Sequence, residues 1–368
     1  MRAADACPGV LRPHQAEDGA MVRLRLPGGR IEASVLRRLA ELATSYGNGV
    51  LQLTSRAGLQ LRGLPDPLPA AFVDEITATG VLPTASHERV RNIVTSPLTG
   101  LLGGLTDLTS LTSTLDAGLI AVPELADLPG RFLFVLDDGR GDVVDLTFDL
   151  GYQATGPTDG VVLVGSADRG LPVGVDEAVE TLLELAQRFT AARAATGAWH
   201  VTDLPDWIES LDLDPVEPVR GTPAVPLGRL GGAASVGVPL ARLTLAQTQL
   251  VEQLVTAGPV VVSPWRGLVL PGTGDCLGSL ERAGFVVDED SVWAQLSACV
   301  GAPFCTRARI DTTAMAAALV ASGDDLPRTH LSGCERRCGA PTAEHVDLVA
   351  PTLTEALRAT RSEVAADE

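Results

Sequence analysis

Four cysteines near the C-terminus constrain this chain more than any other feature of its sequence. Cys299 and Cys305 form one pair with five residues between them, and Cys334 and Cys338 form a second pair with three. Thiolates are soft ligands that suit iron–sulfur clusters or zinc. Structural zinc usually takes pairs with roughly two to four intervening residues. The spacing therefore favours a 4Fe-4S cluster on these cysteines, with structural zinc or unligated thiols as the alternatives.

The composition narrows the class of protein and its surroundings. At 368 residues, the chain is long enough for two or three domains or for one duplicated unit. Its net charge of −18 argues against nucleic acid as a partner, because phosphate backbones are also anionic. No apolar run is long enough to span a membrane, and the first residues lack the apolar core of a secretory signal. Six cysteines without such a signal predict a cytoplasmic protein whose thiols bind metal.

A strand–helix–strand–strand order occurs twice along the chain. In the first copy an alternating segment ends at the Pro27-Gly-Gly turn, and apolar residues at helical spacing follow it. An arginine also recurs, because Arg56 follows Pro27 by 29 residues and Arg266 follows Pro239 by 27. The predicted elements are 22–29, 33–46, 49–54, 59–63 and 69–79 in the first copy, and 235–239, 245–257, 259–263 and 267–270 in the second.

This repetition predicts an α+β fold with two ferredoxin-like modules related by a pseudo-two-fold axis. Two mixed α/β lobes complete the expected architecture. In the first lobe we expect a strand pair at 131–136 and 143–148, and a helix over 176–195. The expected division is a first module at 1–80, a lobe at 85–213, a proline-rich linker at 214–227, a second module at 228–290 and a cysteine-bearing lobe at 291–368.

These features together resemble the sulfite and nitrite reductase superfamily, in which two such repeats hold an iron tetrapyrrole coupled to a four-iron cluster. The most specific motifs are the cysteine array, Leu53-Thr-Ser-Arg56-Ala-Gly-Leu-Gln-Leu-Arg62-Gly and Val90-Arg91-Asn-Ile-Val. Within the superfamily, the chain most resembles the precorrin-3B synthases of aerobic cobalamin biosynthesis. The stretches that carry this resemblance are Cys7-Pro-Gly, Asp18-Gly, Leu128-Pro-Gly-Arg131-Phe, Ser263-Pro-Trp265-Arg266-Gly and His330-Leu-Ser-Gly-Cys334.

The resemblance implies roles for five arginines around a flat ring fringed with acetate and propionate groups. Arg56 and Arg91 match the family's tetrapyrrole-binding arginines. Arg131 matches a basic residue at the reactive face, where it is the candidate catalytic residue and a candidate substrate contact. Arg62 and Arg266 are candidate supporting residues for substrate binding. Arginine suits these roles because its planar fork binds carboxylates bidentately and keeps its proton.

The residues that replace a lysine pair separate the branches of the superfamily. Sulfite reductases place two lysines beside the substrate anion, whereas this chain has Arg131 and Leu133 there and contains no lysine. A leucine supplies neither charge nor a proton for the reduction of an oxyanion. This favours a ring-modifying monooxygenase over a reductase, and the resemblance to precorrin-3B synthases implies oxygen-dependent conversion of precorrin-3A to precorrin-3B, by hydroxylation of a meso carbon with lactone formation.

That function implies further components. Precorrin-3A and dioxygen would be the substrates, and a non-heme iron would activate the oxygen. An external protein or reductase would donate electrons, because the chain has no dinucleotide-binding motif. His330 is a candidate hydrogen-bond donor to cluster sulfur, and Cys7 is a small residue expected to pack near the ring. The alternative functions are a siroheme-dependent sulfite or nitrite reductase and an iron–sulfur electron carrier without enzymatic activity.

Overall fold

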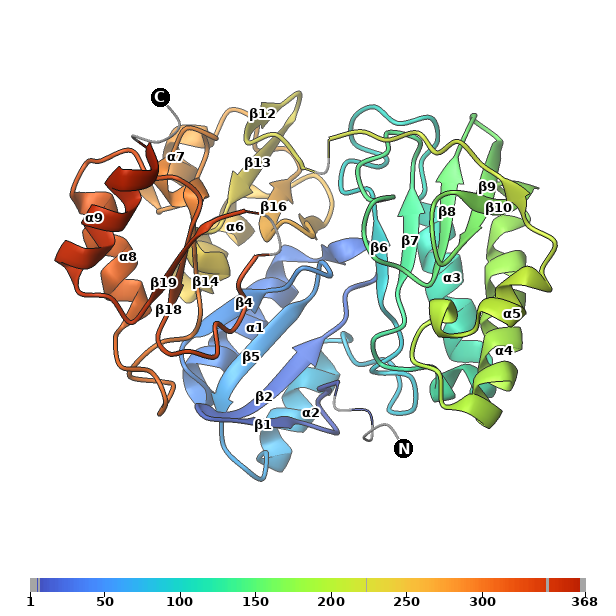
Figure 1. Cartoon of the computed structure of the whole chain (residues 1–368), viewed down its shortest axis with the longest axis horizontal. Coiled ribbons are helices and arrows are strands. Elements are labelled where there is room, and N and C mark those ends of the chain that lie inside the picture. Colours follow the sequence, from blue (N-terminus) through green and yellow to red (C-terminus); the bar gives the residue numbers. More distant parts are fainter. Residues whose placement is uncertain (1–4, 6, 223, 342–343, 365–368) are drawn as a thin grey trace.

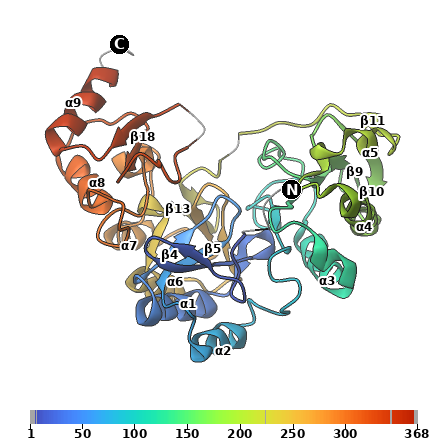
Figure 2. The ribbon, with the colours of Figure 1, turned by 60° about the horizontal axis from the view of Figure 1, so that its bottom comes forward.

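The computed structural model describes residues 5, 7–222, 224–341 and 344–364. Two modules, drawn in blue and gold in Figure 1, lie between a green lobe and a red-orange lobe. Figure 2 shows the two lobes standing on opposite sides of the joined modules. No helix in the described part of the chain is long and apolar enough to cross a membrane.

The first module is a five-stranded antiparallel sheet with helices on one face. Helix α1 (Ala33–Tyr46) buries Leu36, Leu39 and Ala43 against this sheet and ends at Gly47. The strand order is β1-β2-β5-β4-β14. The other elements are β1 (His14–Ala16), β2 (Gly19–Leu24), β4 (Val50–Leu53), β5 (Leu59–Leu64), α2 (Ala70–Ala78) and β14 (Arg242–Thr244).

The second module repeats this arrangement, which confirms the predicted duplication. Helix α6 (Leu245–Leu254) begins at Thr244, whose side chain forms a capping box with Gln247. The strand order β12-β13-β16-β15-β3 matches that of the first sheet position by position. The other elements are β12 (Gly228–Leu230), β13 (Ala233–Gly237), β15 (Val260–Val262), β16 (Gly267–Leu270), α7 (Leu277–Arg282) and β3 (Arg30–Ile31).

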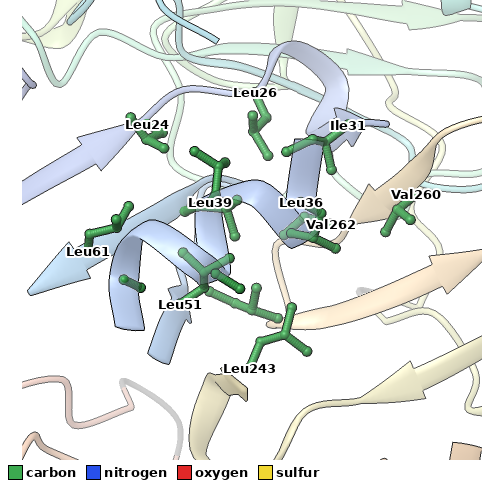
Figure 3. Close-up of a cluster of buried hydrophobic side chains, with 14 of the residues drawn as sticks. Leu24, Leu26, Ile31, Leu36, Leu39, Leu51, Leu61, Leu243, Val260 and Val262 are labelled. Atoms are coloured by element: carbon green, nitrogen blue, oxygen red, sulfur yellow. The ribbon is translucent and has the colours of Figure 1, made fainter. Parts of the chain in front are cut away.

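Each module gives one edge strand to the sheet of the other module. Strand β3 of the first repeat pairs with β15, and strand β14 of the second repeat pairs with β4. Figure 3 shows the result: Leu36 and Leu51 of the first repeat lie beside Val262 and Leu243 of the second. One hydrophobic core therefore serves both modules and fixes their relative position.

The hairpins that follow β4 and β15 have the same internal hydrogen bonds. The N–H of Thr54 donates to the carbonyl of Gly58, and the N–H of Ser263 donates to that of Gly267. In return, each glycine N–H donates to the side-chain oxygen of Thr54 or Ser263, at 3.1 Å in both cases. These bonds fix which residues of the two hairpins correspond.

This correspondence corrects the expected match between Arg56 and Arg266. Arg56 occupies the position of Trp265, and Arg266 occupies the position of Ala57, with φ angles of 62° and 53°. The expected alignment was shifted by one residue. It was based on sequence distances that span helices of different length, 14 residues in α1 and 10 in α6.

Both lobes place a parallel three-stranded core against two helices, which confirms the expected pseudo-two-fold arrangement. Strands β6 (Ile93–Thr95), β7 (Phe134–Asp137) and β8 (Leu150–Ala154) are parallel neighbours in the first lobe. Strands β17 (Leu296–Ala298), β18 (Thr329–Ser332) and β19 (Val346–Val349) are parallel neighbours in the second. The remaining elements are β9 (Asp159–Val164), β10 (Arg169–Gly174), β11 (Asp214–Pro215), α3 (Thr109–Ala121), α4 (Ala178–Thr196) and α5 (Pro205–Glu209) in the first lobe, α8 (Thr312–Ala321) and α9 (Leu353–Val364) in the second, and the short 3-10 helices η1 (Pro27–Gly29), η2 (Pro123–Asp127), η3 (Val201–Asp203), η4 (Pro239–Ala241) and η5 (Val292–Gln295).

The predicted strand at 143–148 is wrong. Strand β7 pairs in parallel with β8, and residues 143–148 belong to the loop between them. The Asp137 carboxylate holds this loop by accepting hydrogen bonds from the N–H groups of Gly139 and Gly141. Val143 and Phe148 are buried in the core beneath the sheet. Their apolar character reflects that packing and not a strand. The helix predicted at 176–195 is present as α4.

The proline-rich segment after the first lobe lies along that lobe. The N–H of Val216 donates to the carbonyl of Asp168, and the N–H of Gly221 donates to that of Gly141, both at 2.9 Å. The Gln153 side chain bonds both backbone groups of Val219. The segment is thus tied down over much of its length.

Candidate functional site

An arginine group forms where the first module meets the first lobe. Its members are Arg23, Arg25, Arg56 and Arg131. Cys7 lies near them, because the charges of Arg25 and Arg131 act on its thiol. Burial, followed by the charge of Asp5, raises the pKa of that thiol. Arg23 and Arg25 alternate with apolar residues along β2 and its continuation, so they leave the sheet on the face opposite the shared core.

Arg25 is the most buried member of the arginine group, with 5% of its surface exposed. It donates to the Pro8 carbonyl, to the Arg23 carbonyl at 2.9 Å and to the Asn92 side chain at 3.3 Å. Burial, and then the charge of Arg23, lowers the pKa of Arg25 to about 10. Arg23 donates from Nη2 to Oε1 of Gln60 at 3.1 Å, but its buried Nε has no hydrogen-bond partner.

The other two members are joined across the boundary between module and lobe. Nη1 of Arg56 donates to the carbonyl of Arg131 at 2.7 Å. The Arg131 guanidinium lies over the Trp199 ring, 5.1 Å from its centroid. Burial lowers the pKa of Arg56. Within the described residues, no carboxylate forms an ion pair with any of the four arginines. Partly buried cations without counter-charges are unfavourable, so the group suits an anionic ligand.

A polar row crosses the face of the first sheet that lies opposite its helices. Arg23 pairs in register with Gln60, Gln60 with Gln52, and Gln52 with Arg242. The Gln60 amide donates to Oε1 of Gln52 at 2.8 Å. At the far end, Nη2 of Arg242 donates to the carbonyl of Cys299 at 2.7 Å. The polar row thus connects the arginine group to the first predicted metal ligand.

The matching row of the second sheet carries two valines in place of the two glutamines. The same registers there hold Ser235, Val269, Val261 and Arg30. Val225 packs with Val261 and Val269 in a small buried cluster. Of the two equivalent sheet faces, the face of the first sheet is polar and suits a charged ligand. The equivalent face of the second sheet is covered.

A cavity of about 450 Å³ lies at the cysteine end of the polar row. It is bounded by β4 and β14 on one side and by residues 300–304 on the other, and both Arg62 and Arg242 line it. Arg62 makes a bidentate ion pair with the buried Asp18 carboxylate, at 2.7 and 2.8 Å. The structure therefore places Arg62 in a cavity wall, with its fork already occupied.

The four predicted metal ligands come together beyond the ends of β17 and β18. Sγ of Cys299 accepts a hydrogen bond from the N–H of Gly333 at 3.1 Å. Burial, and then the neighbouring thiols of Cys299, Cys334 and Cys305, raise the pKa of Cys338. All four thiols therefore share one neighbourhood. In the described ranges, no three His, Cys, Asp or Glu side chains already form a group that could hold a metal ion.

Two buried polar atoms beside these cysteines show that the donor set suits a sulfur cluster. Nε2 of His330 and Oγ of Ser332 have no hydrogen-bond partner, although both side chains are 0% exposed. Nδ1 of His330 lies 2.9 Å from Oγ of Ser297. Burial lowers the pKa of His330. Buried polar groups are normally satisfied, and four thiolates with cluster sulfurs would supply acceptors. The residues present therefore fit an iron–sulfur cluster.

The first lobe contains a closed counterpart of the cysteine site. Ser96 corresponds to Cys299, because each donates its N–H to a carbonyl of the adjacent strand, β7 or β18. Oγ of Ser96 accepts from the N–H of Asp138 at 3.1 Å and donates to Asp142 at 2.6 Å. Arg140 pairs with Asp138 at 2.8 Å. An internal ion-pair network thus occupies the place that the cysteines occupy in the second lobe.

Arg91 lies in a different environment from the one expected. Its guanidinium forms a bidentate pair with Asp116, at 2.7 Å for both bonds, and donates to the Val81 carbonyl at 3.2 Å. Direct binding of a ring carboxylate by Arg91 does not fit this geometry, because it would break a buried ion pair. Arg266, in contrast, lies near the cysteine lobe, since its charge acts on His330, and burial lowers its pKa.

Sequence reasoning missed Arg23, Arg25 and the glutamines of the polar row. The signal was the strict alternation in Val22-Arg23-Leu24-Arg25-Leu26, which places both arginines on one face of a strand. It did not show which face would remain uncovered, because that depends on the lobes.

The sequence is similar to that of several known proteins. Residues 13–78 match the family described as nitrite/sulfite reductase ferredoxin-like half domain. A precorrin-3B synthase from Sinorhizobium sp. is 27% identical over 378 aligned residues, which cover 94% of this chain and 80% of that protein. A ferredoxin–nitrite reductase from Synechococcus elongatus is 28% identical over 398 aligned residues, which cover 89% of this chain and 76% of that protein.

A solved structure shows the same fold. The Mycobacterium tuberculosis NirA protein superimposes with a TM-score of 0.62 and 20% sequence identity. The superposition covers 86% of this chain and 68% of the NirA chain. The likeness therefore extends over both modules and both lobes.

Proposed function

Because the chain belongs to the nitrite and sulfite reductase superfamily, we propose that it is an oxidoreductase that converts precorrin-3A to precorrin-3B with dioxygen. The observation that carries the proposal is the arginine group. It holds four cations, of which Arg23, Arg25 and Arg56 are buried or partly buried, and none of them forms an ion pair with a carboxylate among the described residues, in a chain whose net charge is −18. A flat ring fringed with carboxylates supplies the missing counter-charges.

The residues at the two ends of the polar row have different roles. Arg23, Arg25 and Arg56 bind the carboxylates at the rim of the tetrapyrrole. Arg131, which lies over Trp199, is at the edge of the tetrapyrrole. A 4Fe-4S cluster on Cys299, Cys305, Cys334 and Cys338 would supply single electrons when bound. Dioxygen would give one oxygen atom to the meso carbon, and the other would leave as water with an electron pair and protons from an external donor.

A siroheme-dependent nitrite or sulfite reductase is the competing function. The similarity to ferredoxin–nitrite reductase over 89% of the chain favours it. Against it stands Leu133, which is 3% exposed and packs in a hydrophobic core where a reductase needs a second cation. The absence of lysine from the whole sequence removes any substitute of that kind.

Aerobic incubation with precorrin-3A, a reductant and isotopically labelled dioxygen tests the proposal. We expect a product that has gained one labelled oxygen atom, from protein whose visible spectrum shows iron–sulfur absorbance without siroheme bands. The Cys334→Ser variant should lose iron, sulfide and activity together. The Arg229→Ala variant, which removes an exposed pair with Asp275 and an exposed hydrogen bond to the Gly231 carbonyl, should retain all three.

Two outcomes would overturn the proposed function, and a third would overturn the proposed cluster ligands. Intense siroheme bands with turnover of nitrite or sulfite would identify a reductase instead. A cluster-containing protein that neither binds nor alters precorrin-3A would be an electron carrier. Retention of iron and sulfide in Cys334→Ser would show that the ligand assignment is wrong.

A further inference from the structure

We propose that His330 and Ser332 donate hydrogen bonds to the sulfur atoms of the bound cluster and thereby raise its reduction potential. The inference rests on the proposed function, because it requires a cluster on the four cysteines. It assigns positioning roles to two residues that ligate no metal. Its support comes in three parts: the unsatisfied atoms, the internal symmetry and the orientation of the ring.

The first part is the burial of two donors without acceptors. His330 and Ser332 are both 0% exposed, and neither Nε2 nor Oγ has a hydrogen-bond partner. A buried polar group that is left unsatisfied destabilises the fold. Both residues lie on β18, two positions apart, so their side chains leave the same face of the strand. Cys334 follows two residues later, and the Cys338 backbone acts on the His330 ring as a weak hydrogen-bond partner that does not reach the geometry of a full hydrogen bond.

The second part is the contrast with the first lobe. The registers Val94–Val135 and Ser297–His330 are equivalent, because each pair occupies the middle of two parallel strands. Val94 and Val135 are buried in an apolar core. The fold therefore accepts valine at this position. The Ser297–His330 pair replaces these valines in the lobe with the cysteines, so the sheet itself does not require a polar pair there.

The third part is the orientation of the histidine ring. The Ser297 hydroxyl lies 2.9 Å from Nδ1 of His330 and 3.4 Å from the Thr329 carbonyl. When the hydroxyl donates to the closer atom, Nδ1 is the acceptor and Nε2 carries the proton, whereas a hydroxyl that donates to Thr329 would accept from Nδ1 and leave Nε2 without one. With Nδ1 as the acceptor, Nε2 is a fixed donor that points away from Ser297. Hydrogen bonds to cluster sulfurs stabilise the more negative, reduced cluster and so raise its potential.

Redox titration of His330→Val tests the proposal, because valine is the residue that the first lobe carries at the equivalent position. Iron and sulfide content should stay at the wild-type level. The reduction equilibrium should shift at least tenfold toward the oxidised cluster, which is about 59 mV for one electron. His330→Gln, whose amide can still donate, should restore part of the shift. Ser332→Ala should shift the potential in the same direction.

Controls separate this inference from the proposed function. His14→Gln changes an exposed histidine on β1 and should leave the potential unchanged. Wild-type protein without iron and sulfide would overturn the proposed function and this inference together. An intact cluster whose potential is the same in His330→Val would overturn this inference alone, and would indicate that water satisfies the two donors.

A second measurement covers the case in which His330→Val fails to assemble. Pulsed EPR of the reduced wild-type protein, labelled with nitrogen-15 in its histidines, should show a nitrogen coupled to the cluster. Exchange into heavy water should add a coupled deuteron from Nε2. Absence of both couplings would contradict the proposal whatever the variant does.

Discussion

Nη2 of Arg242 lies 2.7 Å from the carbonyl oxygen of Cys299, so a strand exchanged between the two modules holds the backbone of a predicted cluster ligand. The same nitrogen lies 2.8 Å from the carbonyl of Val300. Strand β14 pairs with β4 in the first sheet, and its arginine reaches into the cysteine lobe. The strand exchange that builds the shared core therefore also positions the cysteines over the polar row.

Substitution of Arg242 by leucine should loosen the cysteine lobe. The Val300 carbonyl would lose its charged donor, and the Cys299 carbonyl would keep only the Thr312 hydroxyl, at about 1.5–3 kcal/mol for each lost hydrogen bond to a charged group. We expect a lower melting temperature and a faster loss of iron and sulfide during anaerobic gel filtration. Arg229→Leu, which removes an exposed pair, should change stability by less than about 1 kcal/mol. Equal stability and equal iron retention in the two variants would show that Arg242 does not hold the cysteine loop.

Arg56 and Arg91 should respond differently to alanine substitution. Arg56→Ala removes a cation from the arginine group and should weaken binding of a tetrapyrrole at least tenfold, because a charged hydrogen bond contributes about 1.5–3 kcal/mol. Arg91→Ala leaves Asp116 without its partner and should lower folding stability by about 3–5 kcal/mol. Fluorescence titration with a stable ring analogue and urea unfolding measure the two effects. A larger loss of affinity in folded Arg91→Ala than in Arg56→Ala would restore the original role of Arg91.

The elements that the sequence predicted well are those with a local cause. Helix α1 follows from apolar residues at helical spacing and ends at Gly47, and the hairpin from 50 to 64 follows from alternation interrupted by a turn. The cysteine spacing also identified the residues that gather in the second lobe. Each of these features is encoded within a few residues and does not depend on distant contacts.

The remaining features depend on contacts between distant segments. The exchange of β3 and β14 follows from packing between the two repeats, which no local pattern records. The apolar run at 143–148 is equally consistent with a strand and with a buried loop. The sequence motif around Arg91 is the same whether the side chain faces a ligand or Asp116. Its environment is decided by helix α3, which brings Asp116 to within 2.7 Å.

The buried Asp142 should make stability depend on pH. Burial raises its pKa from the ordinary 3.8 to about 7. The folded protein then keeps a proton that the unfolded chain releases, so stability falls as pH rises through this window and levels off above it. Asp142→Asn imitates the protonated acid and should flatten this slope. Urea unfolding between about pH 5 and pH 8 measures it. A variant with the same slope as the wild type would show that Asp142 is ionised throughout.

The turns before the exchanged strands offer a matched pair of substitutions. Gly29 and Ala241 occupy equivalent places after Pro27 and Pro239, and both have positive φ, 71° and 58°. A Cβ on Gly29 would lie 2.1 Å from the carbonyl oxygen of Val262, which is backbone and cannot easily move. Gly29→Ala should therefore cost more than about 2 kcal/mol, the upper end of the strain of a left-handed residue alone.

Ala241→Gly makes the reverse change at the equivalent place. It relieves the strain of a left-handed alanine and loses the burial of one methyl group, so stability should change by less than about 1 kcal/mol. Urea unfolding of both variants gives the comparison. If Gly29→Ala were as mild as Ala241→Gly, the close approach of the first turn to β15 would not help to join the modules. If Gly29→Ala is severely destabilising, the absence of a side chain at Gly29 helps to fix how the polar row and the cysteines are placed relative to each other.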